Sequence, residues 1–258
     1  MPNNLNIFTF PLFYLSLSVV TAFHQTPFTV DTLKDATCPD VLSCQTNNVD
    51  TCCSPKYGLL VLAQQWIVGY GPEDSFTVHG LWPDTCDGGH GPGNGCDNSR
   101  HYSNISAIVQ TDASLYEDMN LYWPSYKGHN PSFWSHEWNK HGTCVTTMNP
   151  RCYSNYTTYS EVRDFFRTAL DLRKKYDIYK ALANQGITPG KTYDRNKFAD
   201  AIETELGAEV FLRCRGKSML QEIFMWFHVR GSTNYVPSKR LTGNRGCFKT
   251  IYYPKKYV

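Results

Sequence analysis

Four ionisable side chains gather in the short segment 133–144, which has the sequence Phe-Trp-Ser-His-Glu-Trp-Asn-Lys-His-Gly-Thr-Cys. If this segment is an α-helix up to its glycine, at about 100° per residue, the four groups fall on one face at about 0°, 40°, 100° and 140°. In that angular order they are His136, Lys140, Glu137 and His141. Trp138 and Asn139 then lie on the opposite side. A solvated charged face above a core tryptophan is the alternative, but this set of groups favours a chemical site.

A third histidine stands at the end of an expected strand, in the segment 76–84 with the sequence Phe-Thr-Val-His-Gly-Leu-Trp-Pro-Asp. The strand delivers His79 next to Gly80, where the missing side chain lets another group approach closely. Trp82 offers a flat ring and Asp84 a carboxylate. A lone histidine in such a place is more often structural, so the functional interpretation depends on the presence of both segments in one chain.

A metal site is the strongest rival interpretation of the first segment. In zinc proteases the helical motif His-Glu-x-x-His places two histidines four residues apart. Here the order is His-Glu-x-x-x-His, and the residue four after His136 is Lys140, whose ammonium would repel a divalent cation. The sequence therefore predicts neither a metal nor another cofactor.

Histidines and a lysine without a metal suit general acid–base phosphoryl transfer on RNA, which carries its own nucleophile, the ribose 2′-hydroxyl. One imidazole takes the hydroxyl proton while another protonates the departing 5′-oxygen, and each transfer typically supplies about 10²–10⁴-fold. A cation such as Lys140 would stabilise charge on the phosphoryl oxygens, for about 10²–10³-fold more. An ordinary imidazole pKa of about 6.5 lets one histidine be neutral and another charged in mildly acidic solution.

The 258 residues divide into a leader and a single domain. Residues 3–22 carry no charged side chain, and an apolar run over 7–20 precedes the small residue Ala22, as in a secretory signal, although the usual basic start is missing. A membrane anchor is the alternative, but spanning needs roughly 20 apolar residues. Since no internal repeat or low-complexity tract follows, we expect a signal peptide at 1–22 and one domain at 23–258.

Cysteine usage and charge agree with export. All 10 cysteines follow the leader, and an even number behind a signal indicates a disulfide framework, with hundreds of pairings open by spacing alone. Sequons at Asn104 and Asn155 are candidate glycosylation sites. The net charge is only +2 with eight neutral histidines, and their protonation below about pH 6 would favour a polyanionic partner. We expect an extracellular or an acidic vacuolar or lysosome-like location.

Strands and helices are both expected, in an order that indicates an α+β fold. Apolar runs and alternation predict strands at 58–66, 75–79, 210–213 and 222–229. Five glycines and a proline make 84–96 a loop. Helical spacing predicts a helix at 161–176 with Ser160 as N-cap, and a second from Asp194 through Leu206, ended by Gly207.

The two histidine segments resemble the signature segments of the ribonuclease T2 family: His-Gly-Leu-Trp-Pro at 79–83 and Glu-Trp-Asn-Lys-His-Gly-Thr-Cys at 137–144. The resemblance runs from about Cys38 to Cys247, and the adjacent cysteines at 52 and 53 are similar to the fungal members. It implies an α+β fold with a central antiparallel sheet flanked by helices. It also implies metal-independent cleavage of single-stranded RNA through a 2′,3′-cyclic phosphate to 3′-phosphate ends, with little base specificity.

Roles in catalysis follow from the same resemblance. His141 would be the general base and His79 the general acid of the first step, and the two would exchange roles in the hydrolysis of the cyclic phosphate. His136 would bind phosphate, and Glu137 and Lys140 would stabilise the pentacovalent state. The expected partner is single-stranded RNA, with neither DNA nor a membrane, and a monomer is the default.

The resemblance places Trp82, Asp84 and His90 around the base on the 5′ side of the scissile phosphate. Asp84 could accept a hydrogen bond from an exocyclic amine, which would favour adenine or purines. A second base site would involve Gln65, Pro124, Ser125 and Phe133. The fungal pattern has a tyrosine where His90 stands, and Tyr126 and Lys127 replace smaller polar residues. The base preference is therefore open.

The resemblance also implies a disulfide pairing, which is Cys38–Cys53, Cys44–Cys86, Cys52–Cys152, Cys96–Cys144 and Cys214–Cys247. Two other functions stay in view. One is a secreted RNA-binding protein or toxin that keeps the fold without turnover. The other is a glycosidase, which would use two carboxylates roughly 5–10 Å apart, although the sequence distinguishes no second carboxylate to pair with Glu137.

Overall fold

One mixed sheet organises the computed structural model, which describes residues 38–45 and 48–257. The described strands form a 7-stranded sheet in the order β2-β1-β5-β7-β3, with β4 and β6 also paired to β5. Their bounds are β1 Leu59–Gln65, β2 Thr77–Asp84, β3 Lys191–Asp194, β4 Phe211–Arg215, β5 Met219–Arg230, β6 Asn234–Pro237 and β7 Thr250–Tyr253. Every pairing is antiparallel except that of β5 with β7. The expected α+β fold is confirmed, with this one parallel contact added.

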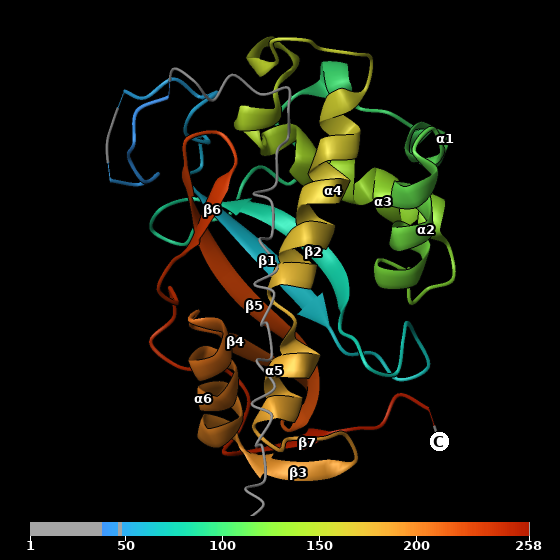
Figure 1. Ribbon diagram of the computed structural model, residues 1–258, viewed down its shortest axis with the longest axis vertical. Helices are drawn as coiled ribbons and strands as arrows, with labels where there is room; N and C mark the ends of the chain where they lie inside the picture. The colour runs from blue at the N-terminus through green and yellow to red at the C-terminus, as the bar shows by residue number, and fades with distance from the viewer. Residues whose placement is uncertain (1–37, 46–47, 258) are drawn as a thin grey trace, which may run out of the picture.

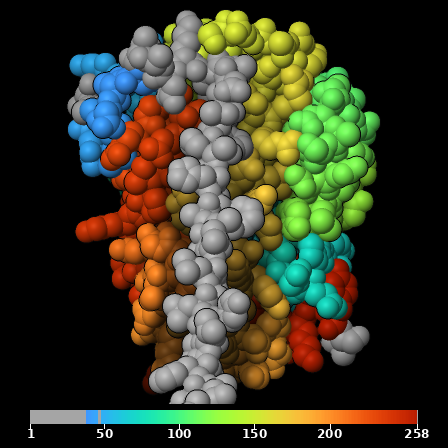
Figure 2. Space-filling view, viewed as in Figure 1, coloured from blue at the N-terminus to red at the C-terminus, as the bar shows by residue number. Residues whose placement is uncertain are grey.

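Helices cover one side of the sheet. They are α1 Ile105–Gln110, α2 Ala113–Tyr122, α3 Asn130–His136, α4 Ser160–Lys175, α5 Ile178–Asn184 and α6 Arg195–Leu206. Helix α4 crosses in front of β1 and β2 (Figure 1), and it contacts both strands. The space-filling view of this side shows the yellow segment of α4 beside the green segments that include α1 and α2 (Figure 2). No described helix is long and apolar enough to cross a membrane.

Strand β1 is buried along its whole length because both of its faces are covered. Successive side chains of a strand point to opposite faces. Leu60 and Leu62 accordingly join the main core with the phenylalanines of α4. Leu59 and Val61 face the other way and pack with Trp226 of β5. The second face of the sheet around β1 is therefore also apolar, and side chains of β2, β4 and β5 cover it there rather than helices.

A β-bulge in β2 decides which of its side chains reach that second face. In the pairing with β1, Ala63 lies opposite Gly80 and Gln64 lies opposite Val78, so His79 is the extra residue. In a regular strand, residues three apart point to opposite faces. The extra residue removes this alternation locally, so that His79 and Trp82 share one face with their rings 4.9 Å apart, centroid to centroid.

Most expected elements are present, with corrections at their ends. The strand expected at 75–79 runs on as β2 to Asp84, because the bulge lets it stay paired with β1. Helix α4 has Tyr159 as its N-cap residue, and Ser160 is the first helical residue rather than the cap. The second helix is as expected: the Asp194 side chain accepts from two backbone N–H groups at its start, and Gly207 ends it at φ 64°.

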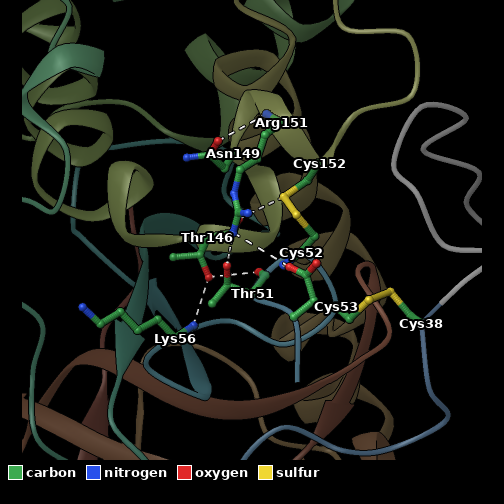
Figure 3. The surroundings of a disulfide bond; sticks show 10 residues. Cys38, Thr51, Cys52, Cys53, Lys56, Thr146, Asn149, Arg151 and Cys152 are labelled. Carbon is green, nitrogen blue, oxygen red and sulfur yellow. Dashed lines mark hydrogen bonds and ion pairs between the residues drawn. A yellow bond between two sulfur atoms is a disulfide. The ribbon is translucent and has the colours of Figure 1, made fainter. Parts of the chain in front are cut away.

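Five disulfides tie the described segments together, and they are the pairs that the resemblance implied: Cys38–Cys53, Cys44–Cys86, Cys52–Cys152, Cys96–Cys144 and Cys214–Cys247. Around Cys52–Cys152, Arg151 Nη2 donates to Thr51 Oγ1 at 2.5 Å, and Thr146 Oγ1 donates to the Thr51 carbonyl at 3.1 Å (Figure 3). The bridge and these hydrogen bonds therefore connect the segment around Cys52 to the turns that follow the helical motif.

Two further expectations concern processing. The signal peptide expected at 1–22 lies outside the described residues. Asn104 and Asn155 are both exposed, as an attached glycan would require, and their glycosylation stays a prediction.

Removal of the Cys52–Cys152 bridge, as Cys52→Ser with Cys152→Ser, should lower the free energy of unfolding by about 2–5 kcal/mol, because the bridge restrains the unfolded chain. It joins residues 100 apart in sequence, whereas Cys214–Cys247 joins residues 33 apart. Loop-closure entropy then predicts a loss about 1 kcal/mol smaller for the matched Cys214→Ser with Cys247→Ser. Urea denaturation of both variants measures the difference, and a larger loss for the shorter loop would contradict this account.

Candidate active site

The two histidine segments meet on this second face of the sheet, in a cleft of about 620 Å³. Strand β2 contributes His79, Trp82 and Asp84 to its lining, and β5 contributes Phe224 and Trp226. The opposite wall comes from the end of α3 and the turn that follows it, with His136, Glu137, Lys140 and His141. All five residues expected to be catalytic therefore line one cavity.

The helical motif differs from the expected α-helix. Helix α3 ends at His136, and Glu137–His141 form a π-helical turn, η3, followed by the 3₁₀ turn η4 (Gly142–Cys144). The backbone N–H of Gly142 donates to the carbonyl of Glu137, five residues back. Such i→i+5 bonding brings residues five apart closer to vertical alignment than an α-helix does. The rings of His136 and His141 accordingly lie 6.0 Å apart.

Glu137 is a buried carboxyl group held beneath Trp82. The indole Nε1 of Trp82 donates to Glu137 Oε2 at 2.9 Å. A Cβ on Gly80 would overlap both the Trp82 nitrogen and this carboxylate oxygen, so the glycine makes room for the contact. Burial raises the pKa of Glu137 to about 7, even though the nearby charge of His79 and the Trp82 hydrogen bond lower it. Glu137 therefore holds its proton in acidic solution.

His79 is oriented by a carboxylate from the neighbouring part of the sheet. Its Nδ1 hydrogen-bonds Glu222 Oε1, and Arg213 Nη1 donates to the other oxygen, Glu222 Oε2, at 3.0 Å. Burial lowers the pKa of His79, but the Glu222 hydrogen bond and the negative charges of Glu137 and Glu222 outweigh it and raise the pKa above its usual 6.5. The free nitrogen, Nε2, is left for another partner.

The pKa values of the two histidines of the helical segment are shifted in the opposite direction, below the usual 6.5. Burial, helped by the charge of Lys140, lowers the pKa of His141 to about 3. The same two causes lower the pKa of His136. Since His141 lies across the Trp82 ring, with 5.5 Å between ring centroids, the cleft holds a neutral imidazole near a protonated one in mildly acidic solution.

Glu222 is the functional residue that sequence reasoning missed. It lies on β5 and reaches His79 because Glu222, Phe224 and Trp226 alternate on one face, whereas Ile223 and Met225 belong to the main core. A single carboxylate inside a strand of apolar and aromatic residues was the available signal. Glu222 is thus a second carboxylate near His79, one that the sequence alone did not distinguish.

The residues expected around the 5′-side base all line the cleft, with Trp82 between His79 and His141 and with Asp84 beside His90. His90 Nδ1 and Asp84 Oδ1 are 2.9 Å apart, and the His90 side chain is 84% exposed. Burial raises the pKa of Asp84, against the effect of its contact with His90. The Cys96–Cys144 bridge ties the loop that carries His90 to the end of the helical segment.

The residues expected at the second base site do not line this cleft, and two of them, Phe133 and Gln65, lie close to His79 and its neighbour Val78. The ring of Phe133 lies 6.0 Å from that of His79, and Gln65 Nε2 donates to the carbonyl of the preceding Val78 at 3.3 Å. Pro124 and Ser125 directly follow Trp123, whose indole donates to the His79 carbonyl at 2.9 Å. Tyr126 is exposed, with the Lys127 ammonium 5.8 Å from its ring centroid.

The metal alternative has one geometric point in its favour. One side-chain ligand atom each of His136, Glu137 and His141 lies within 4.8 Å of the others. The charge of Lys140 disfavours a second cation there, as its lowering of both histidine pKa values shows. Glu137 Oε2 is also occupied by the Trp82 indole. The side chains therefore suit proton transfer better than metal ligation.

Comparisons with known proteins agree on one family. The model of the ribonuclease T2 family matches residues 40–247. Among curated proteins, the chain is 46% identical to ribonuclease Rh of Rhizopus niveus, over 87% of this chain and 94% of that protein. It is 42% identical to ribonuclease T2 of Aspergillus oryzae, over 83% of this chain and 82% of that protein.

Solved structures give the same result. The crystal structure of Actibind, described as a T2 ribonuclease, is 41% identical with a TM-score of 0.81, covering 89% of this chain and 100% of that one. RNase NT in complex with 5′-AMP is 28% identical with a TM-score of 0.58, covering 77% of this chain and 98% of that one.

Glu137→Gln should stabilise the protein at neutral pH but not at pH 4. The folded pKa of about 7 lies above the ordinary 4.5, so the wild type loses stability as the pH rises from about 4.5 through 7. The glutamine does not titrate, and the difference should reach roughly 3 kcal/mol above pH 7. Urea denaturation at pH 4 and pH 8 measures it. The exposed Glu117→Gln serves as control, and an equal effect of Glu137→Gln at both pH values would contradict the burial of this carboxyl.

Proposed function

Because this chain belongs to the ribonuclease T2 family and is a T2-type endoribonuclease, we propose that it cleaves single-stranded RNA by metal-independent acid–base catalysis. The products are 2′,3′-cyclic phosphates, which the same site then hydrolyses to 3′-phosphates. The observation that carries the proposal is that His79 and His141 line one cleft with the Trp82 ring beside both, and that their surroundings shift their pKa values in opposite directions. Where the surroundings raise the pKa of one titratable group and lower that of another, the first is suited to act as the acid and the second as the base.

In the first step, neutral His141 takes the proton of the ribose 2′-hydroxyl, and the 2′-oxygen attacks the adjacent phosphorus. The bond from phosphorus to the 5′-oxygen breaks, and protonated His79 gives its Nε2 proton to that oxygen. Glu222 supports this role because its hydrogen bond to Nδ1 fixes the ring and favours the charged form. In the second step the roles exchange: His79 activates a water, and His141 protonates the 2′-oxygen as the cyclic ester opens.

The pentacovalent phosphate carries extra negative charge on its non-bridging oxygens. Two groups of the π-helical turn stabilise this charge. The Lys140 ammonium supplies positive charge. Glu137, neutral in acidic solution because of its raised pKa, can donate its proton in a hydrogen bond instead of repelling the phosphate. His136, at the mouth of the cleft, binds a phosphate oxygen.

Base recognition uses the two regions on either side of His79. Trp82 stacks on the 5′-side base, an interaction of roughly 1–3 kcal/mol, and Asp84 accepts from an exocyclic amine with His90 beside it. This favours adenine or another purine. A related structure that holds 5′-AMP supports a nucleotide in such a cleft. Gln65, Pro124, Ser125 and Phe133 would bind the second base.

The location and the partner complete the proposal. We infer secretion or delivery to an acidic compartment, where the disulfides persist and His79 is protonated. The substrate is single-stranded RNA and not DNA, which lacks the 2′-hydroxyl. A glycosidase is disfavoured because both Glu222 oxygens are already held, one by His79 and one by Arg213. A binding protein without turnover would have no need for histidines of opposite pKa shift.

Incubation of the purified protein with single-stranded RNA at about pH 5 in EDTA tests the reaction. We expect cyclic phosphate ends that mature to 3′-phosphates, and no cleavage of DNA of the same sequence. His79→Ala and His141→Ala should each reduce the rate by at least about 10²-fold, because each removes one proton transfer. Cleavage that EDTA abolishes, or a wild type that binds RNA without cutting it, would contradict the proposal.

Glu222→Gln should shift the pH dependence of the first step. Activity rises as His141 loses its proton near pH 3 and falls as the pH rises through the pKa of His79, which lies above 6.5. The glutamine keeps a hydrogen-bond acceptor but removes the negative charge that raises the His79 pKa. The alkaline limb of kcat against pH should therefore move to lower pH, with the acid limb unchanged. A profile that superimposes on the wild type would show that Glu222 does not tune His79.

A further inference from the structure

A second, shallower groove of about 280 Å³ adjoins the cleft and has no part in the reaction proposed above. Phe211 lines both cavities, and its ring lies 6.0 Å from that of Phe224 in the cleft. Arg213 lines the groove and bonds Glu222, the partner of His79. A chain that leaves the cleft past Phe211 therefore enters this groove.

The lining of the groove is cationic. Arg213 and Lys217 both line it, and both are exposed. None of the described residues that line it is acidic. By contrast, the cleft is lined by Asp84 and Glu137 as well as by cations. Since Arg213 is itself paired with Glu222, the positive charge that a phosphodiester in the groove would meet is chiefly that of Lys217.

An exposed aromatic ring stands beside these cations. Phe248 is 54% exposed, the highest value among the large apolar side chains of the described residues. The Lys217 ammonium lies 4.9 Å from the centre of its ring, and the Phe248 backbone N–H donates to the Lys217 carbonyl at 3.0 Å. Single-stranded nucleic acids are bound by such pairs, because any base can stack on the ring while the cation meets the backbone.

The groove is also held in shape before any ligand arrives. The Cys214–Cys247 bridge forms part of its lining. Gly246 has a φ of 74°, and a Cβ there would overlap the carbonyl oxygen of Leu212, so the glycine lets the two segments pack closely. A rigid site loses little conformational freedom on binding.

We propose that this groove is a subsite for a further nucleotide of the RNA chain, outside the two that flank the scissile bond. A base stacks on Phe248, and Lys217 binds a phosphate. The proposal rests on the proposed function, since the strand must run from the cleft. It predicts that long substrates are cleaved more efficiently than the dinucleotide that fills only the two base sites.

Two substrates with a single cleavable bond test the subsite. One is a dinucleoside monophosphate, and the other is a strand of nine deoxynucleotides in which one central residue is a ribonucleotide. Lys217→Ala with Phe248→Ala should lower kcat/KM for the long strand about tenfold, as expected for the loss of one stacked base, and leave the dinucleotide unchanged. Lys217→Ala alone should reduce the slope of log(kcat/KM) for the long strand against log salt by about 0.7.

The control is Lys180→Ala with Tyr257→Ala, which removes an exposed lysine and an exposed aromatic ring that line neither cavity. It should leave kcat/KM unchanged for both substrates, and thermal unfolding should show that both double variants are folded. One outcome is that the wild type cleaves both substrates while Lys217→Ala with Phe248→Ala keeps the wild-type ratio of their kcat/KM values. In that case the subsite proposal is wrong and the proposed function stands. If the wild type cleaves neither, the proposed function itself fails.

Discussion

Strand β2 has one residue more than its partner β1 between Val78 and Gly80, and that residue is His79. Without it, regular alternation would put His79 and Trp82 on opposite faces of the sheet. With it, both side chains leave the core together, while Val78 and Leu81 remain inside. The Trp82 indole can then reach Glu137. The contact between the sheet and the helical segment, and with it the shape of the cleft, depends on this one irregular position.

The electrostatics of the cleft follow from its burial. Two carboxyl groups near His79, those of Glu137 and Glu222, are buried, and they have different hydrogen-bond partners. Glu222 has a guanidinium and an imidazole as partners, whereas Glu137 has mainly an indole N–H, and burial raises the pKa of Glu137. The pKa values of His136 and His141, beside Lys140, are lowered instead. An acidic medium thus suits both the fold and the distribution of protons in the cleft.

Sequence alone predicted the local features and missed those set by distant partners. Helix α6 could be predicted from end to end because Asp194 and Gly207 cap it through neighbouring residues. The π-helical turn could not, since Trp138 and Asn139 bond to Arg100 and Tyr102 in another part of the chain. Nor could Glu222, whose bond to His79 spans 143 positions. Short strands such as β3 and β6 carry too little alternation to be recognised.

The adjacent cysteines at 52 and 53 impose an order on biosynthesis. Cys53 bonds to a partner 15 residues earlier, which has already emerged when Cys53 appears, whereas Cys52 must wait for Cys152, 100 residues later. During that interval the Cys52 thiol stands next to a finished bridge and can attack it, because thiolates exchange with neighbouring disulfides. Oxidative maturation of this chain therefore depends on a thiol–disulfide isomerase, or on keeping Cys52 reduced until the helical segment and its turns have been made.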